Sequence, residues 1–267
     1  MCRHIAVLGP DAPLGESLSE PPYSLVRQSW APRHMRNGTV NADGFGVGWY
    51  APGDPLPARY RRAGPVWGDE SFADIARVVR APALLAAVRD ATFAGADAEA
   101  AAAPFAGGPW LFSHNGALTG WPDSAEPLAA LLPPGALLRL AARCDAAFVW
   151  ALVEHRLLGG ASLGRALAEV VTTVDRAAPA SRLNLLLTDG ATVAATAWGD
   201  SLWYLTGPAP GRTVVASEPY DDDPGWTEVP DRTLVTADRT GVTLSSLLPH
   251  TPPASHSPSP PLKEPVL

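Results

Sequence analysis

The chain has 267 residues, 46% of them hydrophobic and 18% charged, so it is long enough to bury a sizeable core. Neither a membrane-spanning run of roughly 18–20 apolar residues nor a secretion signal is visible, which excludes a membrane partner. The formal net charge of −7 argues against nucleic acid as a partner. The two cysteines cannot form a disulfide framework, and a reducing cytoplasm suits them.

The first half of the chain consists of short apolar runs separated by turn-forming residues. Gly9-Pro10 ends the first run, and Pro and Gly occur throughout residues 11–43, which predicts mostly irregular structure there. Ser71 is placed to cap a short helix. The predicted elements are strands at 2–8, 44–50, 83–90 and 110–114, a turn-rich connection at 51–60 and a helix at 71–79.

The second half of the chain changes from a helical period to a strand period. Asp145 is a favourable cap for a helix that ends before Gly159-Gly160. Within 183–205, Asp189-Gly190 and Gly199-Asp200 are hairpin signals. The predicted elements are helices at 145–158 and 162–177, strands within 183–205, and strands at 212–218, 232–237 and 242–247.

The order of these elements predicts the fold class. Strands and helices occur in blocks, which is typical of an α+β fold with two mainly antiparallel sheets covered by helices. One domain is expected over 2–248, because no internal boundary is visible. Residues 249–267 are rich in Pro and Ser, and we expect them to form a disordered tail.

Cys2 is the first candidate catalytic residue. Removal of Met1 would expose an α-amine with an ordinary pKa of about 7.7–8.0 beside a thiol of about 8.5. An amine poised near neutral pH can act as general base for the thiol of its own residue, as in N-terminal nucleophiles. By itself, a Cys near a terminus is more often a packing residue.

Asn115 and Gly116 form the second candidate feature, at the end of an apolar run. The Asn amide and a backbone N–H without a neighbouring Cβ could together stabilise an oxyanion. The same dipeptide is also the commonest signal for a tight turn.

Arg89 and Asp145 form a third candidate feature. Arg89 could pair with a carboxylate and Asp145 could accept from an ammonium group, which is what a free amino-acid headgroup requires. Alternatively, Asp145 only caps its helix and Arg89 makes a structural pair.

The order of the motifs resembles a known family. Cys2, "NADGFGVGW" (41–49), "RDAT" (89–92), "SHNG" (113–116) and "CDAA" (144–147) together resemble the class II glutamine amidotransferases of the N-terminal-nucleophile hydrolase superfamily. Finer stretches, among them "MCRH" (1–4), "NLLLTDG" (184–190) and "VVASEPYDDDPGW" (214–226), resemble the γ-glutamyl-hercynylcysteine sulfoxide amidohydrolases of ergothioneine biosynthesis. One departure is Ala146-Ala147, where amidotransferases often carry Ser and Glu.

The resemblance implies a four-layer αββα fold and an amidase mechanism. It implies that Cys2 is the nucleophile and its amine the base, that Asn115 and Gly116 form the oxyanion hole, and that Arg89 and Asp145 hold the glutamyl α-carboxylate and α-ammonium. The implied reaction cleaves the γ-glutamyl amide of γ-glutamyl-hercynylcysteine S-oxide. No cofactor is expected, and the only expected partner is this small-molecule substrate.

Two other functions fit the same residues. A glutaminase subunit could deliver ammonia to a separate synthase, and a protein that keeps Met1 could bind γ-glutamyl compounds without catalysis. No metal site is predicted, because the spacing of His4, His114, Cys2 and Cys144 matches no metal pattern. The trimethylammonium end of the substrate would favour aromatic faces, for which Trp30, Phe45 and Trp226 are candidates.

Overall fold

The computed structural model describes residues 2–34, 38, 40–91, 98–207 and 211–248. Strands make up two sheets in which every pairing between described strands is antiparallel. The first sheet has seven strands in the order β11-β9-β10-β1-β4-β2-β3. They are β1 (Arg3–Pro13), β2 (Phe45–Trp49), β3 (Ala58–Arg62), β4 (Arg80–Val88), β9 (Trp203–Thr206), β10 (Thr213–Ala216) and β11 (Thr227–Glu228).

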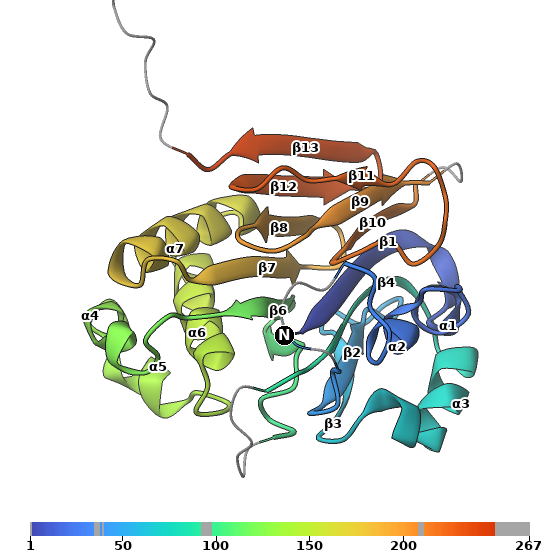
Figure 1. Ribbon diagram of the computed structural model, residues 1–267, viewed down its shortest axis with the longest axis horizontal. Coiled ribbons are helices and arrows are strands. Elements are labelled where there is room, and N and C mark those ends of the chain that lie inside the picture. The colour runs from blue at the N-terminus through green and yellow to red at the C-terminus, as the bar shows by residue number, and fades with distance from the viewer. Residues whose placement is uncertain (1, 35–37, 39, 92–97, 208–210, 249–267) are drawn as a thin grey trace, which may run out of the picture.

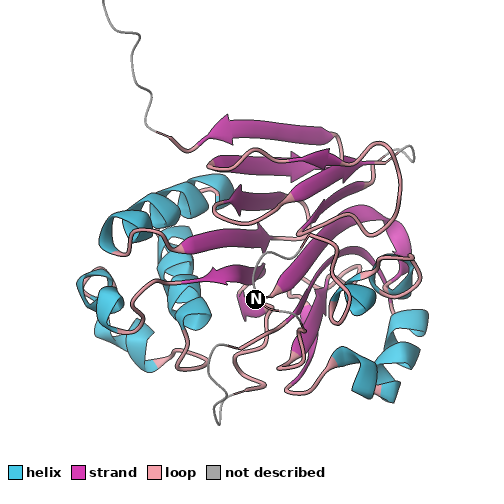
Figure 2. Cartoon of the chain, in the orientation of Figure 1, coloured by secondary structure: helices cyan, strands magenta, loops and turns pink. Residues whose placement is uncertain are grey.

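The second sheet has six strands in the order β13-β12-β8-β7-β6-β5. Figures 1 and 2 show it beside the first sheet, with helices on the outer sides of the pair. Its strands are β5 (Phe105–Gly107), β6 (Trp110–Ala117), β7 (Arg182–Thr188), β8 (Val193–Ala197), β12 (Thr233–Asp238) and β13 (Gly241–Ser246).

Helices cover the outer face of each sheet. The first sheet carries α1 (Gly15–Leu18), α2 (Leu25–Gln28) and α3 (Glu70–Val78), and the second carries the long helices α6 (Asp145–Leu158) and α7 (Leu163–Ala177) (Figure 1). The order of layers is therefore helix, sheet, sheet, helix, and the αββα prediction is confirmed. The remaining short helices are η1 (Val66–Gly68), η2 (Asp123–Ala125), α4 (Glu126–Ala129) and α5 (Pro134–Leu138).

Apolar side chains fill three layers, as alternation along the strands requires. In β1, Ile5 and Val7 pack under α1–α3, whereas Ala6 and Leu8 face the other sheet. In β6, Phe112 packs under α6 and α7, whereas Leu111 faces β1 and β4 across the inter-sheet layer. Each strand near the centre therefore buries both of its faces.

Most predicted elements are confirmed, and the differences have physical reasons. The described residues of 11–43 are mostly irregular, as predicted, but they also contain the end of β1 and two one-turn helices, which are too short to give a periodic pattern. Asp69, not Ser71, caps α3, since its Oδ1 accepts from the Phe72 N–H at 3.1 Å. The connection at 51–60 contains the start of β3, an arginine-rich edge strand without apolar alternation.

Of the two hairpins predicted in the second half of the chain, one is confirmed and one is wrong. Asp189-Gly190 does join the antiparallel pair β7 and β8. The hairpin predicted at Gly199-Asp200 is wrong, because β8 and β9 belong to different sheets. The Oδ1 atom of buried Asn184 accepts from the N–H groups of Trp198 and Asp200, which holds the crossing segment in place of a two-residue turn. The predicted tail, 249–267, lies outside the described residues.

The inter-sheet layer generates a stability prediction. Leu186 is 0% exposed among the residues that join the two sheets. Leu186→Ala is expected to lower the free energy of unfolding by roughly 2–5 kcal/mol, because it leaves a cavity between two sheets that cannot collapse. Leu138→Ala, at an 87% exposed position, is expected to change it by less than about 0.5 kcal/mol. Urea unfolding measures both, and equal effects would contradict the assigned core.

Candidate active site

The register of the first sheet brings Cys2 beside Arg89. Arg3 is opposite Val88 in the antiparallel pair of β1 and β4, so the preceding residue of one strand meets the following residue of the other. Phe45 of β2 is also opposite Val88, so the preceding Gly44 lies opposite Arg89. The Arg89 N–H donates to the Gly44 carbonyl at 2.7 Å. Three segments far apart in the sequence therefore end together.

Arg89 is fixed by the loop before β2. Its Nη1 donates to the Asp43 carbonyl at 3.1 Å, and the Asp43 carboxylate accepts from the Ala91 N–H at 2.8 Å. Gly44 has a φ of +134°, a conformation that favours glycine, and an added Cβ would lie 3.1 Å from the Arg62 carbonyl oxygen. The "NADGFG" stretch thus holds the arginine in position.

The second sheet supplies the facing wall through β6. Between the sheets, His4 Nδ1 and Ser113 Oγ lie 3.1 Å apart. Side chains two residues apart lie on the same face of a strand. The next positions toward the cavity are therefore Cys2, directly before β1, and Asn115 on β6. Asn115 is fully buried, and neither its Nδ2 nor its Oδ1 has a hydrogen-bond partner among the described residues. The Asn115 amide is therefore a hydrogen-bond donor without a partner among the described residues. It lies two residues along β6 from Ser113, which contacts His4 of the other sheet.

The sequence suggested that Asn115 and Gly116 end the strand or form a turn. Neither is the case in the structure. They lie within β6, opposite Asn184 and Leu183 of β7. On the other edge of β6, β5 pairs only with Trp110–Phe112, so no described strand covers that edge beyond Phe112. A Cβ at Gly116 would overlap the Arg182 carbonyl oxygen and lie 2.7 Å from His114 Nε2, so only glycine fits.

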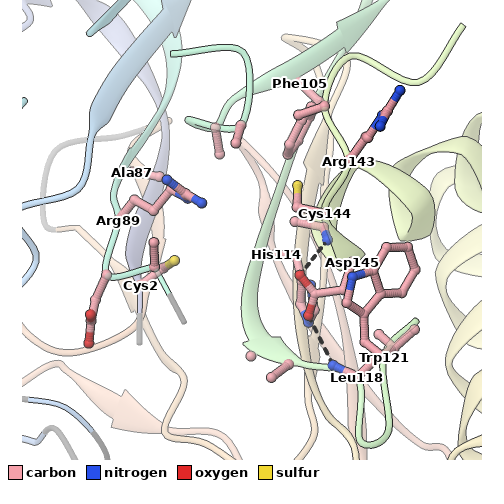
Figure 3. A pocket seen from close by; sticks show the side chains of 18 of the residues that line it. Cys2, Ala87, Arg89, Phe105, His114, Leu118, Trp121, Arg143, Cys144 and Asp145 are labelled. Atoms are coloured by element: carbon pink, nitrogen blue, oxygen red, sulfur yellow. Dashed lines mark hydrogen bonds between the residues drawn. The ribbon is translucent and has the colours of Figure 1, made fainter. Parts of the chain in front are cut away.

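Asp145 is the first residue of α6, and the capping position belongs to Cys144. The prediction that Asp145 is the cap is therefore wrong. Its carboxylate accepts from the Leu118 N–H at 3.0 Å and from the Ala146 N–H at 2.8 Å. These two bonds tie the start of the helix to the end of β6 and keep the carboxylate on the cavity wall (Figure 3).

These segments enclose a cavity of about 640 Å³, a size that holds a small organic ligand. Figure 3 shows Cys2 and Arg89 on one wall, with Asp145, Cys144 and Trp121 on the wall opposite. Of the predicted site residues, Cys2, Arg89, Gly116 and Asp145 line this cavity, whereas Asn115 is buried beside it. The lining also includes residues to which the sequence analysis assigned no role in the site: Asp90, Phe105, His114, Trp121, Arg143 and Cys144.

Signals for some of these additional residues were present in the sequence. Asp90 follows Arg89 in "RDAT", and Arg143 and Cys144 precede Asp145 directly. Trp121 carried no signal of its own. The aromatic residues proposed from sequence for a trimethylammonium group, Trp30, Phe45 and Trp226, are not among the residues that line the cavity.

Burial is the main influence on the pKa of the Cys2 thiol. Burial raises the pKa of the Cys2 thiol, and the positive charge of Arg89 acts in the opposite direction. Burial also raises the pKa of the Cys144 thiol. A thiol in such surroundings needs a base close by to become a nucleophile. Among the described residues, no three His, Cys, Asp or Glu side chains gather as a metal site.

The chain is similar to proteins of one family over most of its length. The sequence profile of the family Glutamine amidotransferases class-II matches residues 21–223. The γ-glutamyl-hercynylcysteine sulfoxide hydrolase of Mycobacterium tuberculosis (strain CDC 1551 / Oshkosh) is 40% identical over 247 residues, which cover 92% of this chain and 97% of that protein. The protein of the same name from Mycolicibacterium smegmatis is 41% identical over 242 residues, 88% of this chain and 95% of the relative.

Solved structures share the fold. A glutamine aminotransferase class-II domain protein from Silicibacter pomeroyi has a TM-score of 0.64 at 24% identity, covering 93% of this chain and all of that one. The glutamine phosphoribosylpyrophosphate amidotransferase from B. subtilis has a TM-score of 0.64 at 14% identity, covering 92% of this chain and 49% of that one. No described helix is long and apolar enough to span a membrane.

His4, which contacts β6 behind the nucleophile, generates a pH prediction. Burial, then the nearby charges of His114 and Arg3, lower the pKa of His4 to about 3. In the unfolded chain the imidazole takes up a proton near pH 6.5, so stability is lost as the pH falls from about 6.5 toward 3. Between pH 7.5 and 5, His4 is expected to contribute about 2 kcal/mol of this loss.

The measurement is urea unfolding at several pH values. His4→Gln is expected to flatten the decline in the free energy of unfolding, whereas His155→Gln, at an exposed position, is expected to leave it unchanged. A His4→Gln protein with the same pH dependence as the parent would show that the folded protein accepts a proton at this imidazole.

Proposed function

The chain belongs to the class II glutamine amidotransferases, and from that membership we propose that it hydrolyses the γ-glutamyl amide bond of γ-glutamyl-hercynylcysteine S-oxide. The products are glutamate and hercynylcysteine S-oxide. The observation that carries the proposal is that Cys2, Arg89, Gly116 and Asp145 line one cavity. The two relatives named above, which match nearly the full chain, support the choice of substrate.

The glutamyl headgroup binds between two opposite charges. Arg89 is anchored through Asp43, so its guanidinium is pre-oriented to pair with the α-carboxylate. Asp145 is anchored by two backbone N–H groups and accepts from the α-ammonium across the cavity. A fixed pair of this kind selects a free amino-acid end and aligns the chain of the substrate toward Cys2.

The chemistry begins after Met1 has been removed. The free α-amine of Cys2 takes the thiol proton, and the sulfur attacks the γ-carbonyl carbon. Asn115 Nδ2 and the Gly116 N–H stabilise the oxyanion of the tetrahedral intermediate. The amine then passes its proton to the leaving nitrogen, the C–N bond breaks, and a glutamyl thioester remains on Cys2.

Water then hydrolyses the thioester with the help of the same α-amine and the same oxyanion hole. The neutral α-amine takes a proton from water, hydroxide attacks the thioester carbonyl, and the oxyanion forms again beside Asn115 and Gly116. The Cys2 sulfur leaves and is reprotonated, and glutamate dissociates. An amine with a pKa near 8 suits both transfers, because it is a base and, once protonated, an acid near neutral pH.

The proposal is tested by incubating the purified protein separately with γ-glutamyl-hercynylcysteine S-oxide and with glutamine. Mass spectrometry is expected to show glutamate and hercynylcysteine S-oxide from the first compound, an intact mass without Met1, and no product with Cys2→Ala. Rapid release of ammonia from glutamine, with little hydrolysis of the first compound, would favour a glutaminase instead. Binding without turnover in a protein that retains Met1 would favour a non-catalytic γ-glutamyl-binding protein.

The oxyanion assignment has its own test. Asn115→Ala is expected to lower kcat by roughly 10²–10³-fold with little change in KM, because the donor acts on charge that forms only in the transition state. Asn115→Asp keeps the shape but removes the amide donor, and a similar loss is expected. Steady-state kinetics on proteins with matching melting temperatures measures both, and activity within a few-fold of the parent would overturn the role of Asn115.

A further inference from the structure

The cavity is lined by more charge than a glutamyl headgroup needs. Its charged lining residues are Arg89, Asp90, Arg143 and Asp145. Under the proposed function, Arg89 and Asp145 are matched to the α-carboxylate and α-ammonium of the substrate. One further cation, Arg143, therefore stands on the wall of the site without an assignment.

Arg143 is not engaged elsewhere. It is exposed, and it forms no ion pair or hydrogen bond with any described residue. Nearby Arg139 is also exposed, but it is not among the residues that line the cavity.

Arg143 lies on the part of the cavity wall that follows from the start of α6. It is two residues before Asp145, and Figure 3 shows it next to Cys144, on the wall opposite Cys2 and Arg89. The cavity is also larger than glutamine requires, since about 640 Å³ is typical of sites for drug-sized ligands. The cavity thus offers more space and one more cation than the glutamyl group alone requires.

We propose that Arg143 is a specificity-determining residue that binds a carboxylate of the leaving group. The inference rests on the proposed function and deepens it, because it sets the class of amine that the enzyme releases. The favoured substrates are γ-glutamyl amides of amino acids, whose released amine carries a carboxylate. Guanidinium and carboxylate can form two parallel charge-assisted hydrogen bonds, which ammonia as a leaving group cannot provide.

The test compares two substrates that differ only in that charge. γ-Glutamyl-glycine carries a carboxylate on the leaving group, and γ-glutamyl-glycinamide replaces it with a neutral amide. The parent enzyme is expected to favour γ-glutamyl-glycine in kcat/KM by roughly ten- to a hundredfold, the range of one charge-assisted contact. Arg143→Gln is expected to bring the ratio close to one, mainly through KM, and Arg143→Lys to restore part of it.

Arg139→Gln is the matched control, because it removes the same charge four residues away and outside the cavity, and it is expected to keep the parent ratio. A parent enzyme without preference, or an Arg143→Gln enzyme that keeps the preference, would overturn the role of Arg143 while leaving the proposed hydrolase intact. If the parent cleaves neither these two compounds nor γ-glutamyl-hercynylcysteine S-oxide, the proposed function fails first.

Discussion

The site depends on the antiparallel register between β1 and β4. Because Arg3 is opposite Val88, the residue before β1 and the residue after β4 must meet, and these are Cys2 and Arg89. A slip of one position would turn every side chain of β1 to the other face, exchanging Ile5 with Ala6 between the two apolar layers. Packing on both faces of the strand therefore fixes where the nucleophile emerges.

The second sheet adds a polar group where apolar packing would be more stable. Buried Asn115, with neither side-chain polar atom partnered among the described residues, costs free energy that the folded chain must offset elsewhere. The offset comes from the inter-sheet layer, where Leu85, Leu111 and Leu186 are completely buried. In the proposed mechanism a substrate oxyanion supplies the missing acceptor, and the Asn115 amide needs no rearrangement to stabilise it.

Local patterns in the sequence were sufficient to predict the central strands and the two long helices, because these bury continuous or periodic apolar surface. They did not predict β3, whose arginines lie at a sheet edge. They also did not predict that the chain crosses to the other sheet after β8, because that segment is held by the buried Asn184, which is distant in the sequence. The resemblance in ordered motifs selected Cys2, Arg89, Asn115, Gly116 and Asp145. It could not select Trp121, because the place of this residue on the cavity wall results from tertiary packing alone.

Hydrolysis and ammonia transfer place different demands on the same catalytic groups. Ammonia is small and uncharged when it leaves, so an enzyme that only releases it gains nothing from charge beyond the scissile bond. An amino-acid leaving group brings a carboxylate that loses hydration inside a cavity, and an unpaired guanidinium on the wall offsets that loss. The same carboxylate, if left without a partner, would be repelled by the nearby negative charge of Asp145. In the proposed complex, Arg143 gives this carboxylate the cationic partner that Asp145 cannot provide.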